Sequence, residues 1–305
     1  MPKKVTKKTT SKLPTVKELL EAGAHFGHET KRWNPKFEEF IYTKRGVFHI
    51  IDLEKTLAKL EEAMNFLQSV ASKGDDIIFL GTKRQARDIV QEEAIRCGAH
   101  FVVNRWVGGL ITNFDTVRKG IKRLREVEKM LSEDLDEFSQ QELAVLRREW
   151  GRLERLFGGV KTLDKLPDAI VTIDACYERI AIKESKKGGV RIVALVDSNT
   201  DPAGIDYPVP GNDDAIKSVC LFAKYFADAV LAGNKGKGVK HDLRNFERVG
   251  VKEVVEDKKE EKEEKEEKKK KRLSKKKEPK ELKTQKKKSS KKKVKSKRKI
   301  VKKAK

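Results

Sequence analysis

The 305-residue sequence has few of the residues that build disulfide-rich or metal-binding scaffolds. Its three cysteines, Cys97, Cys176 and Cys220, stand far apart, and no Cys-x-x-Cys pair occurs. That spacing argues against a zinc ribbon or a disulfide framework, so we expect inert thiols in the apolar core. No stretch approaches the ~20 apolar residues that span a bilayer, and no apolar run follows the first lysines. We therefore expect a cytoplasmic chain with no membrane partner.

Acidic residues are scarce at both ends of the sequence. Residues 1–13 hold five Lys and no acid, and residues 268–305 hold 23 Lys or Arg against two acids. The net charge of +23 is therefore concentrated at the ends, and residues 14–255 carry only about +1. Like charges resist compaction until a polyanion neutralises them. We predict a basic N-terminal arm over 1–13, a globular domain over 14–240 and a charged, Lys-rich disordered tail over 241–305.

A nucleic acid is the favoured partner of these ends, ahead of a solubility tail or a membrane tether. Apolar residues are too sparse in the last forty positions for an amphipathic helix that would lie on a membrane.

Short apolar runs alternate with helical patterns through most of the domain. Runs at 77–80, 101–103, 169–173 and 190–196 predict buried strands, and helices are expected at 83–97, 178–187 and 213–232. A capping box at Thr15 and Glu18 predicts a short helix, two strands are expected around 40–42 and 47–51, and Asp52 precedes a long amphipathic helix. The alternation predicts an α/β fold with a doubly wound, flavodoxin-like parallel sheet.

Residues 113–158 interrupt this alternation with a different pattern. Apolar residues recur at spacings of three and four in two stretches, and Ser139 with Glu142 forms a second capping box between them. We predict an inserted antiparallel coiled-coil hairpin that stands off the sheet domain.

Two segments are expected at the carboxyl edge of the sheet, where ligands of parallel sheets bind. Residues 81–84 (Gly-Thr-Lys-Arg) follow a predicted strand and open a predicted helix, whose N-terminus suits a phosphate. They match neither a Walker A loop nor Gly-x-Gly-x-x-Gly, so we predict no cofactor. Residues 104–109 add Arg105, which pairs with phosphate, and Trp106, which either stacks on a base or packs against the base of the hairpin.

Residues 25–36 carry similar chemistry. His25 and His28 are spaced to share a metal if helical, but the neighbouring glycines favour a histidine pair that meets RNA or acidic side chains. Asp197, Asp201, Asp213 and Asp214 offer acid–base chemistry or a hard cation site. Ordinary turn and helix-start roles are favoured for these acids, and we predict no metal.

The motifs together resemble the bacterial-type ribosomal protein S2 family of the small subunit. The resemblance spans about residues 14–235 and rests on an ordered set: the His-Phe-Gly-His of 25–28, Trp-Asn-Pro-Lys of 33–36, Gly-Thr-Lys-Arg-Gln-Ala of 81–86, Arg-Trp-Val-Gly-Gly of 105–109, Asp-Ser-Asn-Thr-Asp-Pro of 197–202 and Pro-Gly-Asn-Asp-Asp of 210–214. It implies a non-enzymatic constituent of the small ribosomal subunit that acts in translation. It gives no role to the tail after about residue 240.

Family membership implies binding to small-subunit (16S-type) ribosomal RNA between head and body, contact with neighbouring small-subunit proteins, and support for docking of protein S1. No small-molecule substrate is expected. Two rivals stay open at this point: a sugar-phosphate-binding enzyme on a similar fold, and a nonspecific nucleic-acid-condensing protein. The predicted RNA-binding residues are polar, basic or aromatic: His25, His28, Arg32, Trp33, Asn34, Lys36, Lys83, Arg84, Arg105, Trp106, Asn113, Arg118, Lys122 and Arg123.

Overall fold

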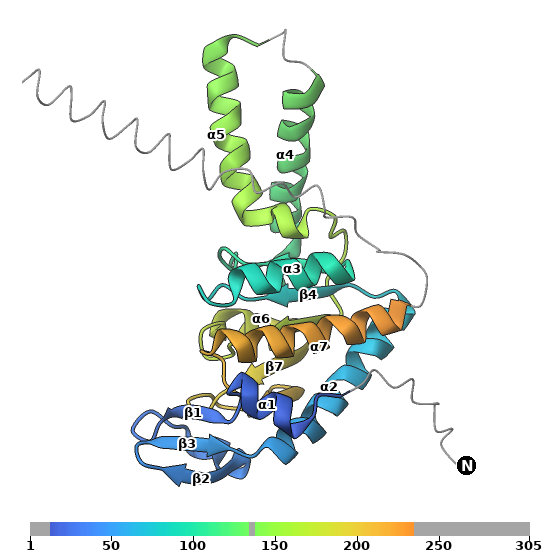
Figure 1. Cartoon of the computed structure of the whole chain (residues 1–305). Helices are drawn as coiled ribbons and strands as arrows, with labels where there is room; N and C mark the ends of the chain where they lie inside the picture. The colour runs from blue at the N-terminus through green and yellow to red at the C-terminus, as the bar shows by residue number, and fades with distance from the viewer. Residues whose placement is uncertain (1–12, 134–137, 235–305) are drawn as a thin grey trace, which may run out of the picture. The chain divides into compact units, whose positions relative to one another are not determined.

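The computed structural model of the chain describes residues 13–133 and 138–234 (Figure 1). Apart from Leu13, the predicted basic arm lies outside these residues, and so does the whole predicted tail. Within the described ranges, no helix is long and apolar enough to cross a membrane.

Five parallel strands of the described residues form the central sheet. They are β4 (Ile77–Leu80), β5 (His100–Val102), β6 (Ala169–Thr172), β7 (Arg191–Val196) and β8 (Tyr207–Pro210). Their order across the sheet is β5-β4-β6-β7-β8. Counted along the chain this is 2-1-3-4-5, the strand order of flavodoxin-like sheets. The predicted α/β fold with a parallel sheet is confirmed.

Strand β8 was not predicted, because its sequence contains Pro208 and Pro210. Proline cannot donate a ladder hydrogen bond, so a run with two prolines does not resemble a strand. The structure places β8 at the outer edge of the sheet, beside β7 alone. An edge strand needs ladder donors on one side only, which makes the prolines tolerable there.

Helices cover both faces of the sheet. Helices α2 (Leu53–Lys73), α3 (Arg87–Cys97) and α7 (Ile216–Asn234) pack on one face, and α6 (Arg179–Gly188) lies on the other (Figure 1). Strand β4 shows why both faces need covering. Its Phe79 packs in the hydrophobic cluster under α2, α3 and α7, while Ile78 and Leu80 pack in the cluster on the α6 face. Side chains that alternate between faces follow from the period of two in a strand.

A small antiparallel sheet precedes this domain in sequence. It follows α1 (Val16–Ala22) and contains β1 (Phe26–Glu29), β2 (Ile41–Arg45) and β3 (Phe48–Ile51), in the order β1-β3-β2, with a 3₁₀ helix at Pro35–Phe40. The predicted capping boxes and the Asp52 cap of α2 are confirmed. Strand β1 was missed because its Gly27 suggested a break. A Cβ at Gly27 would lie 2.9 Å from Ser198 Oγ, so glycine permits the close approach of β1 to the segment after β7.

The predicted hairpin consists of α4 (Phe114–Glu133) and α5 (Gln140–Phe157), which project from the sheet domain side by side (Figure 1). Its base is not independent of the sheet. Buried residues of both helices, Val117, Ile121, Leu124 and Leu153, share one apolar cluster with Ile78 of β4. The predicted boundaries at 113 and 158 therefore cut through a hydrophobic core.

The expectation of three core cysteines is wrong for two of them. Cys97 is buried, whereas Cys176 and Cys220 are exposed. Cys220 lies on α7 beside the buried Val219 and faces away from the sheet, and Cys176 lies in the turn that follows β6.

Gly159 marks a close approach between the base of the hairpin and strand β5. A Cβ at this position would lie far inside van der Waals contact with the carbonyl oxygen of Phe101. We expect Gly159→Ala to lower the free energy of unfolding by about 3 kcal/mol, since overpacking a rigid backbone contact costs about 1–3 kcal/mol or more. Gly151→Ala in α5 is the matched control. Its Cβ meets nothing within 4 Å, so it should stabilise by about 0.5–1 kcal/mol. Urea unfolding of both variants measures the difference, and equal midpoints would contradict it.

Candidate functional site at the carboxyl edge of the sheet

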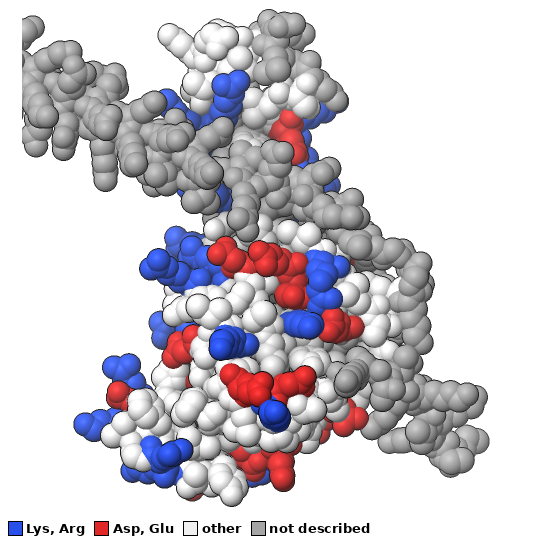
Figure 2. All heavy atoms as spheres, viewed as in Figure 1, with Lys and Arg blue, Asp and Glu red and all other residues white. Residues whose placement is uncertain are grey.

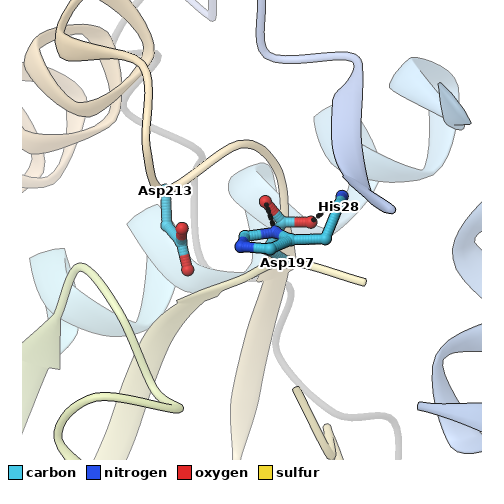
Figure 3. A group of neighbouring side chains, drawn as sticks. All are labelled: His28, Asp197 and Asp213. Carbon is cyan, nitrogen blue, oxygen red and sulfur yellow. Dashed lines mark hydrogen bonds and ion pairs between the residues drawn. The ribbon is translucent and has the colours of Figure 1, made fainter. Parts of the chain in front are cut away.

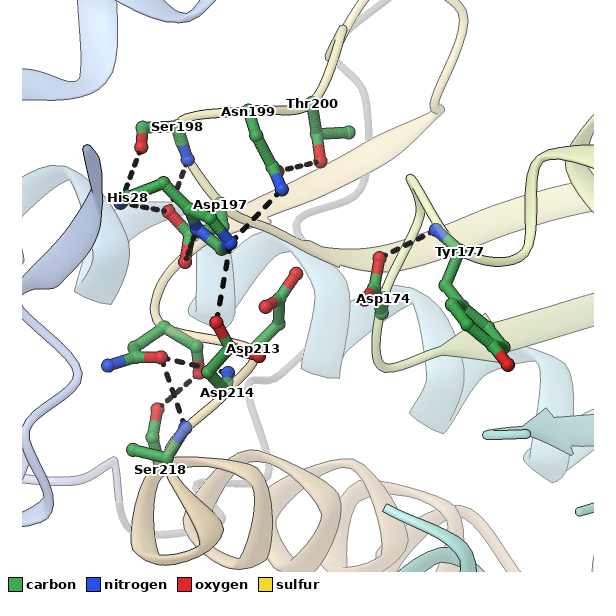
Figure 4. Close-up of polar contacts among 12 residues, drawn as sticks. His28, Asp174, Tyr177, Asp197, Ser198, Asn199, Thr200, Asp213, Asp214 and Ser218 are labelled. Atoms are coloured by element: carbon green, nitrogen blue, oxygen red, sulfur yellow. Dashed lines mark hydrogen bonds and ion pairs between the residues drawn. The ribbon is translucent and has the colours of Figure 1, made fainter. Parts of the chain in front are cut away.

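Charged side chains converge where four of the parallel strands end. Within one to four residues of the end of each strand, the chain turns and directs an acid or a lysine to the same edge. We call this set, with one histidine from β1, the carboxyl-edge cluster: His28, Lys83, Asp174, Asp197, Asp213 and Asp214. Figure 4 shows its histidine and its four acids.

The Lys83 ammonium lies at the centre of the acidic side chains. Its Nζ is 2.9 Å from Asp174 Oδ2, 2.9 Å from Asp213 Oδ1 and 2.7 Å from Asp214 Oδ1. Burial alone would lower the pKa of Lys83, but the charge of Asp213 and bonds to its neighbours outweigh burial and raise that pKa above its usual value. The lysine is a fixed internal cation.

His28 lies between two acids of the cluster. Its Nδ1 is 2.9 Å from Asp197 Oδ2, and its Nε2 is 3.3 Å from Asp214 Oδ2 (Figure 4). The hydrogen bond to Asp197 raises the pKa of His28 to about 9 against the opposing effect of burial. The sequence left open whether His28 meets RNA, acidic side chains or a metal, and in the structure it contacts acidic side chains.

The Asp213–Asp214 turn is held by Asn212. The Asn212 Oδ1 accepts hydrogen bonds from the backbone N–H groups of Asp214 and Ala215, and its Nδ2 donates to the carbonyl of Gly23. Asp213 is completely buried. Burial raises the pKa of Asp213 to about 7, and Asp174 and Asp197 add to this effect while Lys83 opposes it.

The predicted phosphate site at residues 81–84 needs correction. Helix α3 begins at Arg87, four residues later than expected, and its N-cap Ala86 makes no side-chain cap hydrogen bond. The N–H and hydroxyl groups of Thr82 both donate to Glu178 Oε1, at 2.8 and 2.5 Å. A buried carboxylate of the chain itself therefore occupies the donors that we had expected to face a phosphate.

The predicted segment 32–36 meets the segment after β7. The Asn34 N–H donates to the Ser198 carbonyl at 2.7 Å, and Lys36 Nζ is 2.6 Å from Asp201 Oδ2. Trp33 is half-buried, with its ring 5.2 Å from that of His49, and His25 packs on Phe26. Arg32 extends into solvent.

Two further predicted residues have roles inside the chain. Trp106 is 8% exposed and belongs to the core cluster at the base of the hairpin, with Leu110 and Phe157. The structure therefore fits the interpretation in which Trp106 packs against the base of the hairpin. In this conformation its indole ring is covered by other side chains, so an RNA base cannot stack on it. Arg123 makes a two-point ion pair with Glu149 that ties α4 to α5.

The remaining predicted residues are exposed. Arg84 follows β4 and Arg105 follows the adjacent β5, while Asn113, Arg118 and Lys122 lie along the start of α4. These four cations and Arg32 make no ion pair with another described residue. On the face shown in Figure 2, both basic and acidic side chains occur over the sheet domain, in keeping with its near-neutral charge.

Sequence reasoning missed Asp174 and Glu178 as parts of this edge. Asp174 accepts a hydrogen bond from the Tyr177 N–H at 2.8 Å (Figure 4). It also accepts one from Lys83 Nζ at 2.9 Å. Both acids lie just after β6, and an acid that follows a predicted parallel strand is the signal that would have found them.

These features define an α/β protein with exposed arginines at the ligand-binding edge of its sheet, a surface suited to an anionic partner. A family model described as ribosomal protein S2 matches residues 19–233. The chain belongs to the ribosomal protein S2 family, as the sequence motifs predicted. It is a structural, non-enzymatic component of the small ribosomal subunit in translation, and its partners are small-subunit ribosomal RNA and ribosomal proteins.

Proposed function

We propose that the chain binds small-subunit ribosomal RNA between the head and the body of the subunit and supports the docking of protein S1. The observation that carries the RNA contact is the pair Arg84 and Arg105. They follow the adjacent strands β4 and β5, both are exposed, and neither makes an ion pair with a described residue. Two free guanidinium groups at neighbouring strand ends suit the phosphates of one RNA backbone.

Arg118 and Lys122 extend this surface onto the hairpin. They are four residues apart on α4, so they lie on one face of the helix, and both are exposed. We propose that α4 and α5 act as a coiled-coil contact arm on a flavodoxin-like body. Arg32, with the polar edges of Asn34 and Asn113, completes the proposed RNA surface.

The Lys-rich tail after residue 240 has a different part in the proposal. Its cations follow no regular pattern, so they add affinity for RNA without reading sequence or shape. Selectivity then rests with the exposed residues of the domain.

Replacing Arg84 and Arg105 with Ala tests the domain contact. We expect the double variant to bind the cognate rRNA fragment more weakly than the unmodified chain does, with a smaller loss for a scrambled duplex. The slope of log affinity against log salt should fall by about two, because two phosphate contacts disappear. Filter binding at several salt concentrations measures both quantities.

The matched control is Lys17→Ala with Lys59→Ala. It removes the same charge from α1 and α2, where both lysines pair with acids of their own helix. It should leave discrimination between the two RNAs unchanged. Equal losses in the two double variants would show that only net charge matters and would contradict the proposed surface.

Docking of S1 is tested separately. Small subunits assembled with the chain should retain S1 on sedimentation, and subunits assembled without it should lose S1. Retention of S1 by the depleted subunits would refute that part of the proposal.

A further inference from the structure

Three side chains of the carboxyl-edge cluster are arranged as ligands of a cation. One ligand atom each of His28, Asp197 and Asp213 lies within 4.8 Å of the other two (Figure 3). They come from three separate parts of the chain: β1, the end of β7 and the turn after β8. The fold, and not local sequence, brings them together.

Asp213 supplies an independent sign that a ligand belongs here. Its side chain is 0% exposed, and its Oδ2 has no hydrogen-bond partner among the described residues. The other oxygen, Oδ1, is held by Lys83 at 2.9 Å. A buried carboxylate oxygen without a partner is costly. Figure 3 shows the Asp213 carboxylate beside the His28 ring, whose other contacts in that view are with Asp197.

The charges of the cluster leave room for a further cation. Four carboxylates, of Asp174, Asp197, Asp213 and Asp214, surround one lysine and one histidine. The acids outnumber the basic groups even when both basic groups are counted as charged. Asp197 and Asp213 are almost completely buried, so water can do little to stabilise their negative charge. A bound metal ion would stabilise it directly.

The ligand types select the ion. An imidazole nitrogen with two carboxylates suits Zn²⁺ or a similar first-row divalent ion, whereas Mg²⁺ and Ca²⁺ prefer oxygen ligands throughout. The two carboxylates are already oriented by partners outside the ligand set. Asp197 Oδ1 accepts the backbone N–H groups of His28 and Ser198, which are not ligand atoms, and the Lys83 ammonium holds Asp213. Such outer partners are typical of protein metal sites.

We propose that a divalent transition-metal ion of the zinc type binds between His28, Asp197 and Asp213 and joins the small antiparallel sheet to the carboxyl edge of the parallel sheet. The sequence alone had favoured no metal, because it gave no sign that β1 meets the acids after β7 and β8. The site is structural, since three protein ligands from three segments fix the relative positions of these segments.

The test uses the full chain, freed of metal by chelation, with zinc as the probe. We expect one Zn²⁺ per chain by calorimetric titration, and a rise in melting temperature of about 5–10 °C at a hundredfold excess over Kd. Mg²⁺ should give neither effect at the same concentration. Asp213→Asn should weaken zinc binding by more than about 100-fold, because loss of an outer partner alone costs about 10–100-fold. Asp164→Asn, at an exposed acid that pairs with Arg125, is the control and should bind zinc as the unmodified chain does.

A second measurement avoids dependence on whether the Asp213 variant folds. In the unmodified chain, the X-ray absorption spectrum of bound zinc should show one imidazole ligand among nitrogen and oxygen neighbours at about 2.0–2.2 Å, with no sulfur, and the imidazole signal should be absent in His28→Gln. Zinc bound without the His28 imidazole would overturn the proposal, as would zinc affinity unchanged in a folded Asp213→Asn. Failure of zinc to bind the unmodified chain at about 100 micromolar would also overturn it, because structural zinc sites with about 10–16 kcal/mol of binding free energy saturate far below that concentration.

Discussion

Replacing residues 116–156 with a short Gly-containing loop is expected to abolish the cooperative unfolding of the sheet domain. The replaced segment contains Val117, Ile121, Leu124 and Leu153, which share a buried cluster with β4. Loss of each such side chain costs about 2–5 kcal/mol when it is buried among leucine-sized neighbours. Four such losses sum to about 8–20 kcal/mol, which is comparable to or larger than the total stability of about 5–15 kcal/mol that a domain has.

A shorter replacement separates the arm from its base. A loop in place of residues 126–147 removes the outer part of the hairpin, including the buried Val127 and Leu143, but keeps the cluster shared with the sheet. This variant should melt cooperatively near the temperature of the unmodified chain. Thermal and urea unfolding, followed by circular dichroism, compare the two. Cooperative melting of the longer replacement would restore the view that the whole hairpin stands apart from the core.

Deleting residues 256–305 is expected to have the largest effect on RNA binding. The segment holds 27 Lys or Arg against ten acids. If about eight of its cations meet phosphates, the slope of log affinity against log salt should flatten by about 6–7. Affinity for cognate rRNA and for unrelated RNA should fall by similar factors, because phosphate contacts carry no sequence information.

The Arg84 and Arg105 double variant is the counterpart of the tail deletion. It changes the salt slope by only about two yet should reduce discrimination between the cognate fragment and a scrambled duplex. Both proteins are titrated against both RNAs over the same range of salt. The division of roles is refuted if the tail deletion abolishes discrimination while the double variant retains it.

Most helices and strands could be predicted because their apolar periods and caps are local. The capping boxes at Thr15 and Ser139 and the buried run of β4 need no knowledge of distant residues. Strands β1 and β8 could not be predicted in the same way. Gly27 and Pro208 oppose a strand locally, and only the neighbouring Ser198 segment and the sheet edge explain why each residue is accommodated.

The site was predicted in position but only partly in composition. A parallel sheet correctly indicated that the segments after 80 and 102 meet at one edge. It gave no sign that Lys83 would be surrounded by acids from two other strand ends, those of β6 and β8, or that Glu178 would occupy the Thr82 donors. These interacting residues are separated by about a hundred positions in the sequence. Their pairing depends on the order of the strands in the sheet, and the spacing of apolar residues along the chain does not reveal that order.

The prolines of β8 also limit the pairing of this sheet edge with a strand of another molecule. The Gly211 N–H donates inward to the Val196 carbonyl, and alternate residues of a strand point to opposite sides. Pro208 and Pro210 therefore turn their nitrogens outward, where neither has a hydrogen to offer. The Pro210 carbonyl is taken by the Thr56 hydroxyl at 2.8 Å. An incoming strand finds few backbone groups to pair with, so this edge resists edge-to-edge aggregation while the chain awaits assembly.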